Sequence, residues 1–145
     1  MKGSSFFKMI IRKPPVFFLL AFLVACAGDS ARAGAREQGA DGYQRITAHQ
    51  AHDMMQRMGS NGFVLVDVRT AMEFRAEHIA GAILIPVDQM QRRAAAELPD
   101  KDAVILIYCR TGARASTAAG ILADKGYTQV FNIGGIESWP FGTVR

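Results

Sequence analysis

Cysteine and histidine are scarce in this chain of 145 residues, which has two cysteines and three histidines. His49 and His52 stand one helical turn apart, but no cysteine or further histidine is close to them in the sequence, so a metal site is not expected. A long apolar run is also missing, because the run from Val16 to Ala25 has about half the length of a membrane-spanning helix. A permanent transmembrane segment is therefore the weaker interpretation of this run.

An excess of basic residues is absent from most of the chain, although the whole sequence carries a formal net charge of +4. Five of its 17 basic residues and one of its 13 acidic residues lie in the first 33 positions. Without these, 12 basic and 12 acidic residues remain, and that part of the chain is formally neutral. The composition therefore gives no reason to expect a nucleic-acid partner.

Residues 1–33 have the pattern of an export signal, with a basic start, an apolar run and a return of charge at Asp29. The apolar run ends in Leu23-Val24-Ala25-Cys26, which resembles the bacterial lipoprotein box, in which the cysteine is lipidated and becomes the new N-terminus. Two ordinary signal-peptidase sites compete with this interpretation, Ala25-Cys26-Ala27 and Ala31-Arg32-Ala33.

The expected location is the cell envelope. Because Ala27 rather than aspartate follows Cys26, resemblance to lipoprotein sorting rules favours an outer-membrane lipoprotein facing the periplasm. A soluble periplasmic protein is the second alternative and an uncleaved anchor the third. Residues 27–42 lack an apolar period and predict a flexible tether, so the domain is expected over residues 43–145.

From residue 43 onward, strand-like and helix-like segments alternate, which predicts an α/β fold. The expected structure is an open, mainly parallel five-stranded sheet with helices on both faces. The strands are expected at residues 43–46, 63–68, 82–85, 103–108 and 129–133. The helices are expected after a cap at Thr47, after the capping box Thr70-Ala71-Met72-Glu73, over residues 87–98, and from about residue 114 to 125.

Cys109 directly follows the strongest buried-strand segment of the chain and precedes a helix. Export would leave it unpaired, since processing removes Cys26 from disulfide chemistry or leaves it on a tail. The loop between strand and helix is Arg110-Thr111-Gly112-Ala113-Arg114. Its backbone N–H groups, its two arginines and the helix N-terminus all favour a thiolate over a thiol and can hold an anion. The residues alone therefore predict an anion-accepting cysteine site.

Cys109-Arg110-Thr111-Gly112-Ala113-Arg114 resembles the active-site loop of rhodanese domains. Further motifs of that family follow the expected order: Asp67-Val68-Arg69, Glu73-Phe74, His78-Ile79-Ala80-Gly81-Ala82-Ile83 with Ile85-Pro86, and Gly134-Gly135-Ile136-Glu137-Ser138-Trp139. The resemblance covers roughly residues 43–140. One departure is Ala115, which stands where many relatives carry a hydroxyl residue that can donate to the sulfur.

The resemblance implies a single-domain sulfurtransferase with Cys109 as its catalytic nucleophile. Cys109 would take the outer sulfur of thiosulfate or of a persulfide donor and pass it to a thiophilic acceptor such as cyanide, a thiol or a partner protein. Residues 110–114 would bind the anionic donor. No metal or organic cofactor is implied, and contact with a membrane is expected only through a lipid on Cys26.

Two other functions fit parts of the pattern. The first is a carrier module whose persulfide is delivered to one dedicated protein partner. The second is a phosphatase, because rhodanese domains resemble Cdc25-type phosphatases in fold. The phosphatase loop has five residues between cysteine and arginine, whereas four separate Cys109 from Arg114, which favours sulfur transfer.

Four polar residues outside the loop have structural interpretations. Asp67 and Arg69 are expected to form a supporting polar pair near the site rather than to bind substrate. Glu73 is expected to cap a helix rather than to act as an acid. His78 is expected to stabilise a turn, since a thiolate that is already formed needs no general base.

Overall fold

The computed structural model describes residues 37–38 and 42–145. All described residues belong to one compact unit, Ala33–Arg145. The predicted export signal, the predicted lipidation site Cys26 and most of the predicted tether lie outside the described residues. Within the part that is described, no helix has both the length and the apolar character needed to span a bilayer.

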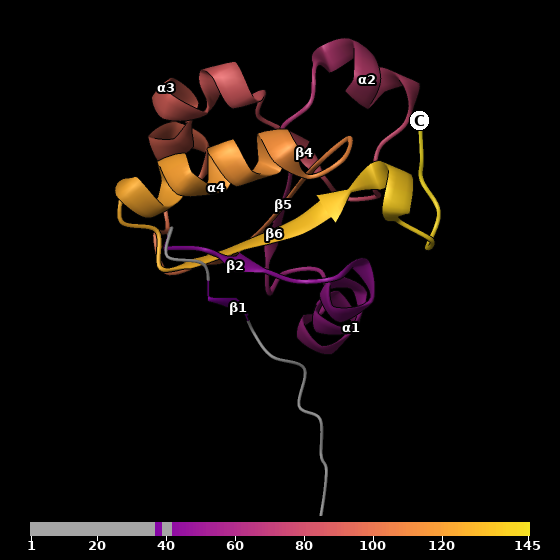
Figure 1. Cartoon of the computed structure of the whole chain (residues 1–145), viewed down its shortest axis with the longest axis horizontal. Helices are drawn as coiled ribbons and strands as arrows, with labels where there is room; N and C mark the ends of the chain where they lie inside the picture. Colours follow the sequence, from indigo (N-terminus) through magenta and orange to yellow (C-terminus); the bar gives the residue numbers. More distant parts are fainter. Residues whose placement is uncertain (1–36, 39–41) are drawn as a thin grey trace, which may run out of the picture. The chain divides into compact units, whose positions relative to one another are not determined.

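A sheet with the strand order β1-β2-β6-β5-β3-β4 forms the centre of the described fold (Figure 1). Neighbouring strands from β2 to β4 in this order pair in parallel, and β1 pairs antiparallel with β2. The strands are β1 (Glu37–Gln38), β2 (Gln44–Arg45), β3 (Val64–Asp67), β4 (Ile83–Leu84), β5 (Val104–Cys109) and β6 (Gln129–Gly135). The predicted parallel sheet of five strands is confirmed, and the two-residue β1 adds a sixth strand at its edge.

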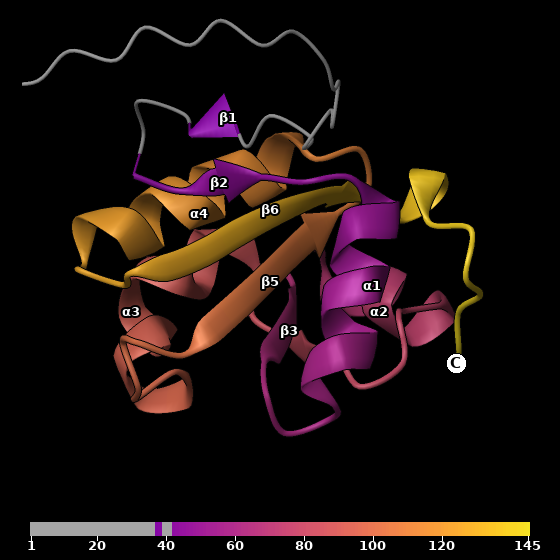
Figure 2. The same cartoon turned by 90° about the horizontal axis from the view of Figure 1, so that it is seen from below.

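Helices cover both faces of the sheet, as predicted (Figure 2). Helix α1 packs on one face, and α3 and α4 lie side by side on the other. The helices are α1 (Ala48–Met58), α2 (Ala71–Ala76), α3 (Val87–Glu97) and α4 (Ala113–Asp124), and a 3-10 helix (Ile136–Ser138) follows β6. The short α2 and the C-terminal segment lie near the carboxyl ends of the parallel strands (Figure 1).

Capping boxes begin two of the helices. The Thr47 hydroxyl accepts a hydrogen bond from the Gln50 backbone N–H, and the Gln50 side chain accepts one from the Thr47 N–H. Thr70 and Glu73 make the same pair of hydrogen bonds at the start of α2, so the predicted capping box there is confirmed. Each cap satisfies N–H groups that have no partner within the helix, which fixes where the helix begins.

Strand β5 lies between two apolar layers, because alternate side chains point to opposite faces of the sheet. Ile105 and Ile107 pack with α3 and α4, whereas Leu106 and Tyr108 pack in the layer under α1. All four are fully buried. Burial of side chains of this size stabilises the fold by about 2 kcal/mol each. The strand that carries Cys109 at its end is therefore firmly anchored.

Candidate active site

Cys109 is the last residue of β5, and the residue is 1% exposed. By strand alternation it points to the same face as Ile107, toward the start of α4. The Gly112 N–H donates a hydrogen bond to Sγ at 3.0 Å. Gly112 precedes the first residue of α4 and has a φ of 106°, which a side chain would oppose. The sulfur therefore faces an N–H donor at the positive end of a helix.

The end of β6 packs directly against the cysteine loop. Gly135 pairs with Cys109 at a point where the register between β5 and β6 shifts. A Cβ at Gly135 would lie 2.1 Å from the carbonyl oxygen of Arg110 and 2.6 Å from Cα of Thr111. Glycine is needed here for close backbone approach. This close approach gives a physical reason for the second glycine of the motif that begins Gly134-Gly135, which the sequence alone identified only by resemblance.

Asn132 ties the loop to β6 and was missed by sequence reasoning. The residue is 5% exposed, and its side chain donates to the carbonyl oxygen of Gly112 at 3.2 Å and to Oγ of Ser116 at 2.8 Å. Its Oδ1 accepts from the Gly134 N–H at 2.9 Å. The available signal was one amide residue inside the apolar segment Val130-Phe131-Asn132-Ile133. Asn132 therefore links the start of α4 to the end of β6.

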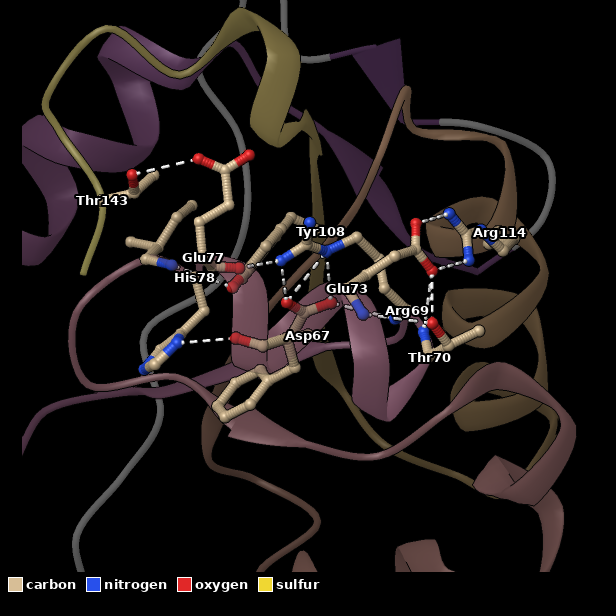
Figure 3. Close-up of polar contacts among 11 residues, drawn as sticks. Asp67, Arg69, Thr70, Glu73, Glu77, His78, Tyr108, Arg114 and Thr143 are labelled. Atoms are coloured by element: carbon tan, nitrogen blue, oxygen red, sulfur yellow. Dashed lines mark hydrogen bonds and ion pairs between the residues drawn. The ribbon is translucent and has the colours of Figure 1, made fainter. Parts of the chain in front are cut away.

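Arg114 is held by Glu73 of α2 in a bidentate ion pair (Figure 3). Nη1 and Nη2 of Arg114 lie 2.9 Å and 2.8 Å from Oε2 and Oε1 of Glu73. The hydrogen bond from Arg114 is the main cause that holds the pKa of Glu73 well below its ordinary value. The same hydrogen bond raises the pKa of Arg114, to which Cys109 also contributes through charge and a side-chain hydrogen bond. Glu73 thus does more than cap α2.

Arg110 pairs with Glu137 of the 3-10 helix, with Nε 2.6 Å from Oε1. Both side chains are more than half exposed, so solvent screens this pair. The hydrogen bond to Glu137 raises the pKa of Arg110. Both loop arginines therefore have carboxylate partners. Thr111 and Ala113, which also belong to the predicted donor-binding loop, are exposed.

Asp67 and Arg69 form a buried ion pair with each other, 2.7 Å between Nη2 and Oδ2 (Figure 3). Nη2 of Arg69 also donates to the carbonyl oxygen of Glu77 at 2.6 Å, which joins the end of α2 to β3. Tyr108 lies beside this pair, with its hydroxyl accepting from the Ile79 N–H at 3.0 Å. Burial raises the pKa of Tyr108. This network fixes the segments on either side of α2.

The three histidines all contact aromatic rings or backbone. Nδ1 of His78 lies 3.0 Å from the carbonyl oxygen of Phe74, and the His78 backbone pairs with Val144. His52 stacks on Phe141 with 3.8 Å between ring centroids, and His49 meets the edge of the same ring. No group of three or more His, Cys, Asp or Glu residues able to hold a metal ion occurs among residues 37–38 and 42–145.

Two hollows border the cysteine loop on different sides. One, of about 300 Å³, is lined by Arg69, Glu73, Arg110 and Glu137 among others. The other, of about 470 Å³, lies against the start of α4 and includes Gly112 and Asn132 in its wall. The hollow lined by Glu73 and Glu137 is the one that holds charged side chains of both ion pairs of the loop. A donor that enters this hollow meets Arg69 and Arg110, and each of these arginines is already paired with a carboxylate.

Comparison with known proteins identifies the family. The model of the rhodanese-like domain matches residues 47–140. Thiosulfate sulfurtransferase PspE of Escherichia coli (strain K12) is 39% identical over 80 residues, which cover 55% of this chain and 77% of that protein. Thiosulfate sulfurtransferase GlpE of Haemophilus influenzae (strain PittEE) is 35% identical over 98 residues, which cover 67% of this chain and 88% of that protein.

A solved structure described as rhodanese with anions from E. coli has the same fold, with a TM-score of 0.54 and 35% sequence identity. The alignment covers 57% of this chain and 96% of that one. The family match includes β3, β5, the cysteine loop and the end of β6, which are the parts that build the site described above. The chain therefore belongs to the rhodanese-like domain family and is an enzyme of the rhodanese type.

Proposed function

We propose that this protein moves a sulfane sulfur from thiosulfate or a persulfide donor to a thiophilic acceptor through a persulfide on Cys109. The observation that carries the proposal is the position of Sγ, at the end of a buried strand and 3.0 Å from the Gly112 N–H at the head of α4. An N–H donor and a helix N-terminus both stabilise negative charge on sulfur, which favours the nucleophilic thiolate. The names of the two relatives support thiosulfate as a donor.

The proposed reaction is a double displacement. The Cys109 thiolate attacks the outer sulfur of thiosulfate, a new S–S bond forms, and the S–S bond of thiosulfate breaks. Its electron pair leaves with sulfite. The acceptor then attacks the outer sulfur of the persulfide, so that cyanide becomes thiocyanate or a thiol becomes a new persulfide, and the Cys109 thiolate is restored. No electron is lost or gained overall, so the cycle needs no external oxidant or reductant.

Residues 110–114 are proposed to hold the donor and the departing sulfite. Loop N–H groups that point at developing negative charge stabilise the transition state without rearranging. The four residues between Cys109 and Arg114 make a smaller loop than the five of Cdc25-type phosphatases, which favours a sulfur atom over a phosphoryl group. Sulfur transfer is therefore proposed in preference to phosphatase activity.

Turnover with thiosulfate and cyanide tests the proposal. The wild-type protein is expected to produce thiocyanate, and Cys109→Ser is expected to produce none. A Cys109→Ser variant with wild-type turnover would overturn the role of the cysteine. A wild-type persulfide that forms with thiosulfate but is discharged only by another protein would indicate the carrier function. Hydrolysis of an aryl phosphate in place of sulfur transfer would indicate the phosphatase.

We also propose that the protein is exported and anchored through a lipid on Cys26. The sequence of residues 1–33 is the support for this proposal, and a soluble periplasmic protein is the alternative. Mass spectrometry of the N-terminal peptide from the membrane fraction is expected to find a lipidated Cys26. An N-terminus at Gly34, recovered from the soluble periplasmic fraction, would instead indicate ordinary signal-peptidase cleavage after Ala33.

A further inference from the structure

Glu73 binds the arginine that ends the cysteine loop more completely than a helix cap requires. Its Oε1 accepts from Nη2 of Arg114, and its Oε2 accepts from Nη1 of Arg114 and from both the N–H and the hydroxyl of Thr70. Both side chains of the ion pair are about one third exposed, at 34% and 30%. Cys109 is among the groups that raise the pKa of Arg114, after Glu73 as the main one. The carboxylate of Glu73 therefore binds both terminal nitrogens of the Arg114 guanidinium, at the end of the cysteine loop.

We infer that Glu73 is a specificity-determining residue, because its carboxylate competes with the anionic donor for Arg114 and weakens the binding of doubly charged donors. The inference rests on the proposed function. A bidentate carboxylate satisfies the same pair of N–H groups that an oxyanion would use. Its negative charge also repels a donor anion in the adjacent hollow, and this repulsion grows with the charge of the donor. Thiosulfate, with two charges, is the donor that Glu73 disfavours most.

The second ion pair of the loop provides a contrast. Arg110 and Glu137 are 67% and 52% exposed, and water competes for both groups. The charge of Glu137 is therefore screened more strongly than that of Glu73. Replacement of Glu137 by glutamine is therefore expected to change donor binding less than replacement of Glu73 by glutamine.

The chain itself shows which substitution isolates the charge of Glu73. In α1, Gln50 occupies the capping position that Glu73 occupies in α2, and the Gln50 Oε1 accepts from the Thr47 N–H at 2.9 Å. A glutamine at position 73 can therefore keep the cap of α2 while it removes the negative charge. In Glu73→Ala, the residue-73 N–H can still donate to the Thr70 hydroxyl, so this second variant also keeps part of the cap.

Two sulfane donors that differ in charge test whether the effect of Glu73 on donor binding depends on the charge of the donor. Thiosulfate carries two negative charges and methanethiosulfonate carries one, and both present an outer sulfur to Cys109. For Glu73→Gln we expect KM for thiosulfate to fall about fivefold, with kcat not reduced, and KM for methanethiosulfonate to fall roughly twofold. Glu97→Gln removes a carboxylate from the Arg93–Glu97 pair on α3 and is the matched control, with both KM values unchanged.

Binding to a protein without the nucleophile tests the inference independently of turnover. Calorimetry is expected to find that thiosulfate binds about fivefold more tightly to Cys109→Ser/Glu73→Gln than to Cys109→Ser. This result would support the inference even if the wild-type protein transferred no sulfur, which would overturn only the proposed function. Unchanged or weaker thiosulfate binding in a folded Glu73→Gln or Glu73→Ala protein would overturn the inference, because Glu73 would then only position Arg114.

Discussion

Gly135 lies where the end of β6 meets the loop that follows Cys109, and its replacement by alanine is a demanding test of the described site. The added Cβ would stand 2.1 Å from the carbonyl oxygen of Arg110 and 2.6 Å from Cα of Thr111. Non-bonded heavy atoms prefer separations of roughly 3.5 Å, so the loop or the strand must move by about 1.4 Å to relieve the contact with Arg110. Both near atoms belong to the backbone, so rotation of a side chain cannot relieve the contact.

Two effects of Gly135→Ala are expected. Overpacking of this kind costs about 1–3 kcal/mol of unfolding free energy. Displacement of a positioning loop by about 1 Å costs about 100-fold in activity, because donor N–H groups no longer point at the reacting sulfur. The φ of Gly135 is −120°, which alanine adopts without strain, so the expected loss comes from the steric contact alone.

Urea unfolding and kcat/KM for thiosulfate measure the two effects. Gly120→Ala in α4 is the matched control, because nothing lies within 4 Å of an added Cβ there. Alanine is the better helix former, so this control is expected to gain about 0.5–1 kcal/mol and to keep its activity. A Gly135→Ala protein with wild-type stability and wild-type kcat/KM would refute the described packing of β6 against the loop.

Two further predictions concern polar contacts near the site. Asn132→Ala removes three hydrogen bonds at the base of the loop, so it should cost about 1–3 kcal/mol of unfolding free energy and lower kcat/KM. Gln129→Ala at the exposed start of β6 is the control and should leave kcat/KM unchanged. Equal effects on kcat/KM in the two variants would contradict the bridging role of Asn132. The pKa of Glu73 is lowered by folding, so the stability from its pair with Arg114 is present above the pKa of an unfolded glutamate and is lost as the pH falls toward the folded value. As the pH is lowered from about 7 to about 3, the unfolding free energy of the wild type should therefore fall by up to about 1 kcal/mol more than that of Glu73→Gln. A difference between the two proteins that does not change with pH would contradict this expectation.

Local signals in the sequence were enough for most of the fold. Thr70 and Glu73 predicted the start of α2 because a capping box needs only residues close in the chain. The valine- and isoleucine-rich runs predicted β3 and β5 because strands covered on both faces are continuously apolar. The two-residue β1 has too few residues to show any period.

Partners distant in the chain could not be predicted in the same way. Glu73 and Arg114 are 41 positions apart, and no periodicity shows that α2 brings one carboxylate to the end of the cysteine loop. The pairing of Arg110 with Glu137 depends likewise on how the segment after β6 turns back over the loop. Sequence reasoning located the loop of residues 109–114, but the charge balance of its arginines required the structure.

The mass of the Cys109 peptide after exposure to thiosulfate tests the central claim most directly. Wild-type protein incubated with thiosulfate, then alkylated and digested, is expected to carry one additional sulfur atom on Cys109. That atom should disappear when cyanide is added, with an equal amount of thiocyanate formed. A Cys109 peptide of unchanged mass, from folded protein that also forms no thiocyanate, would contradict the persulfide account.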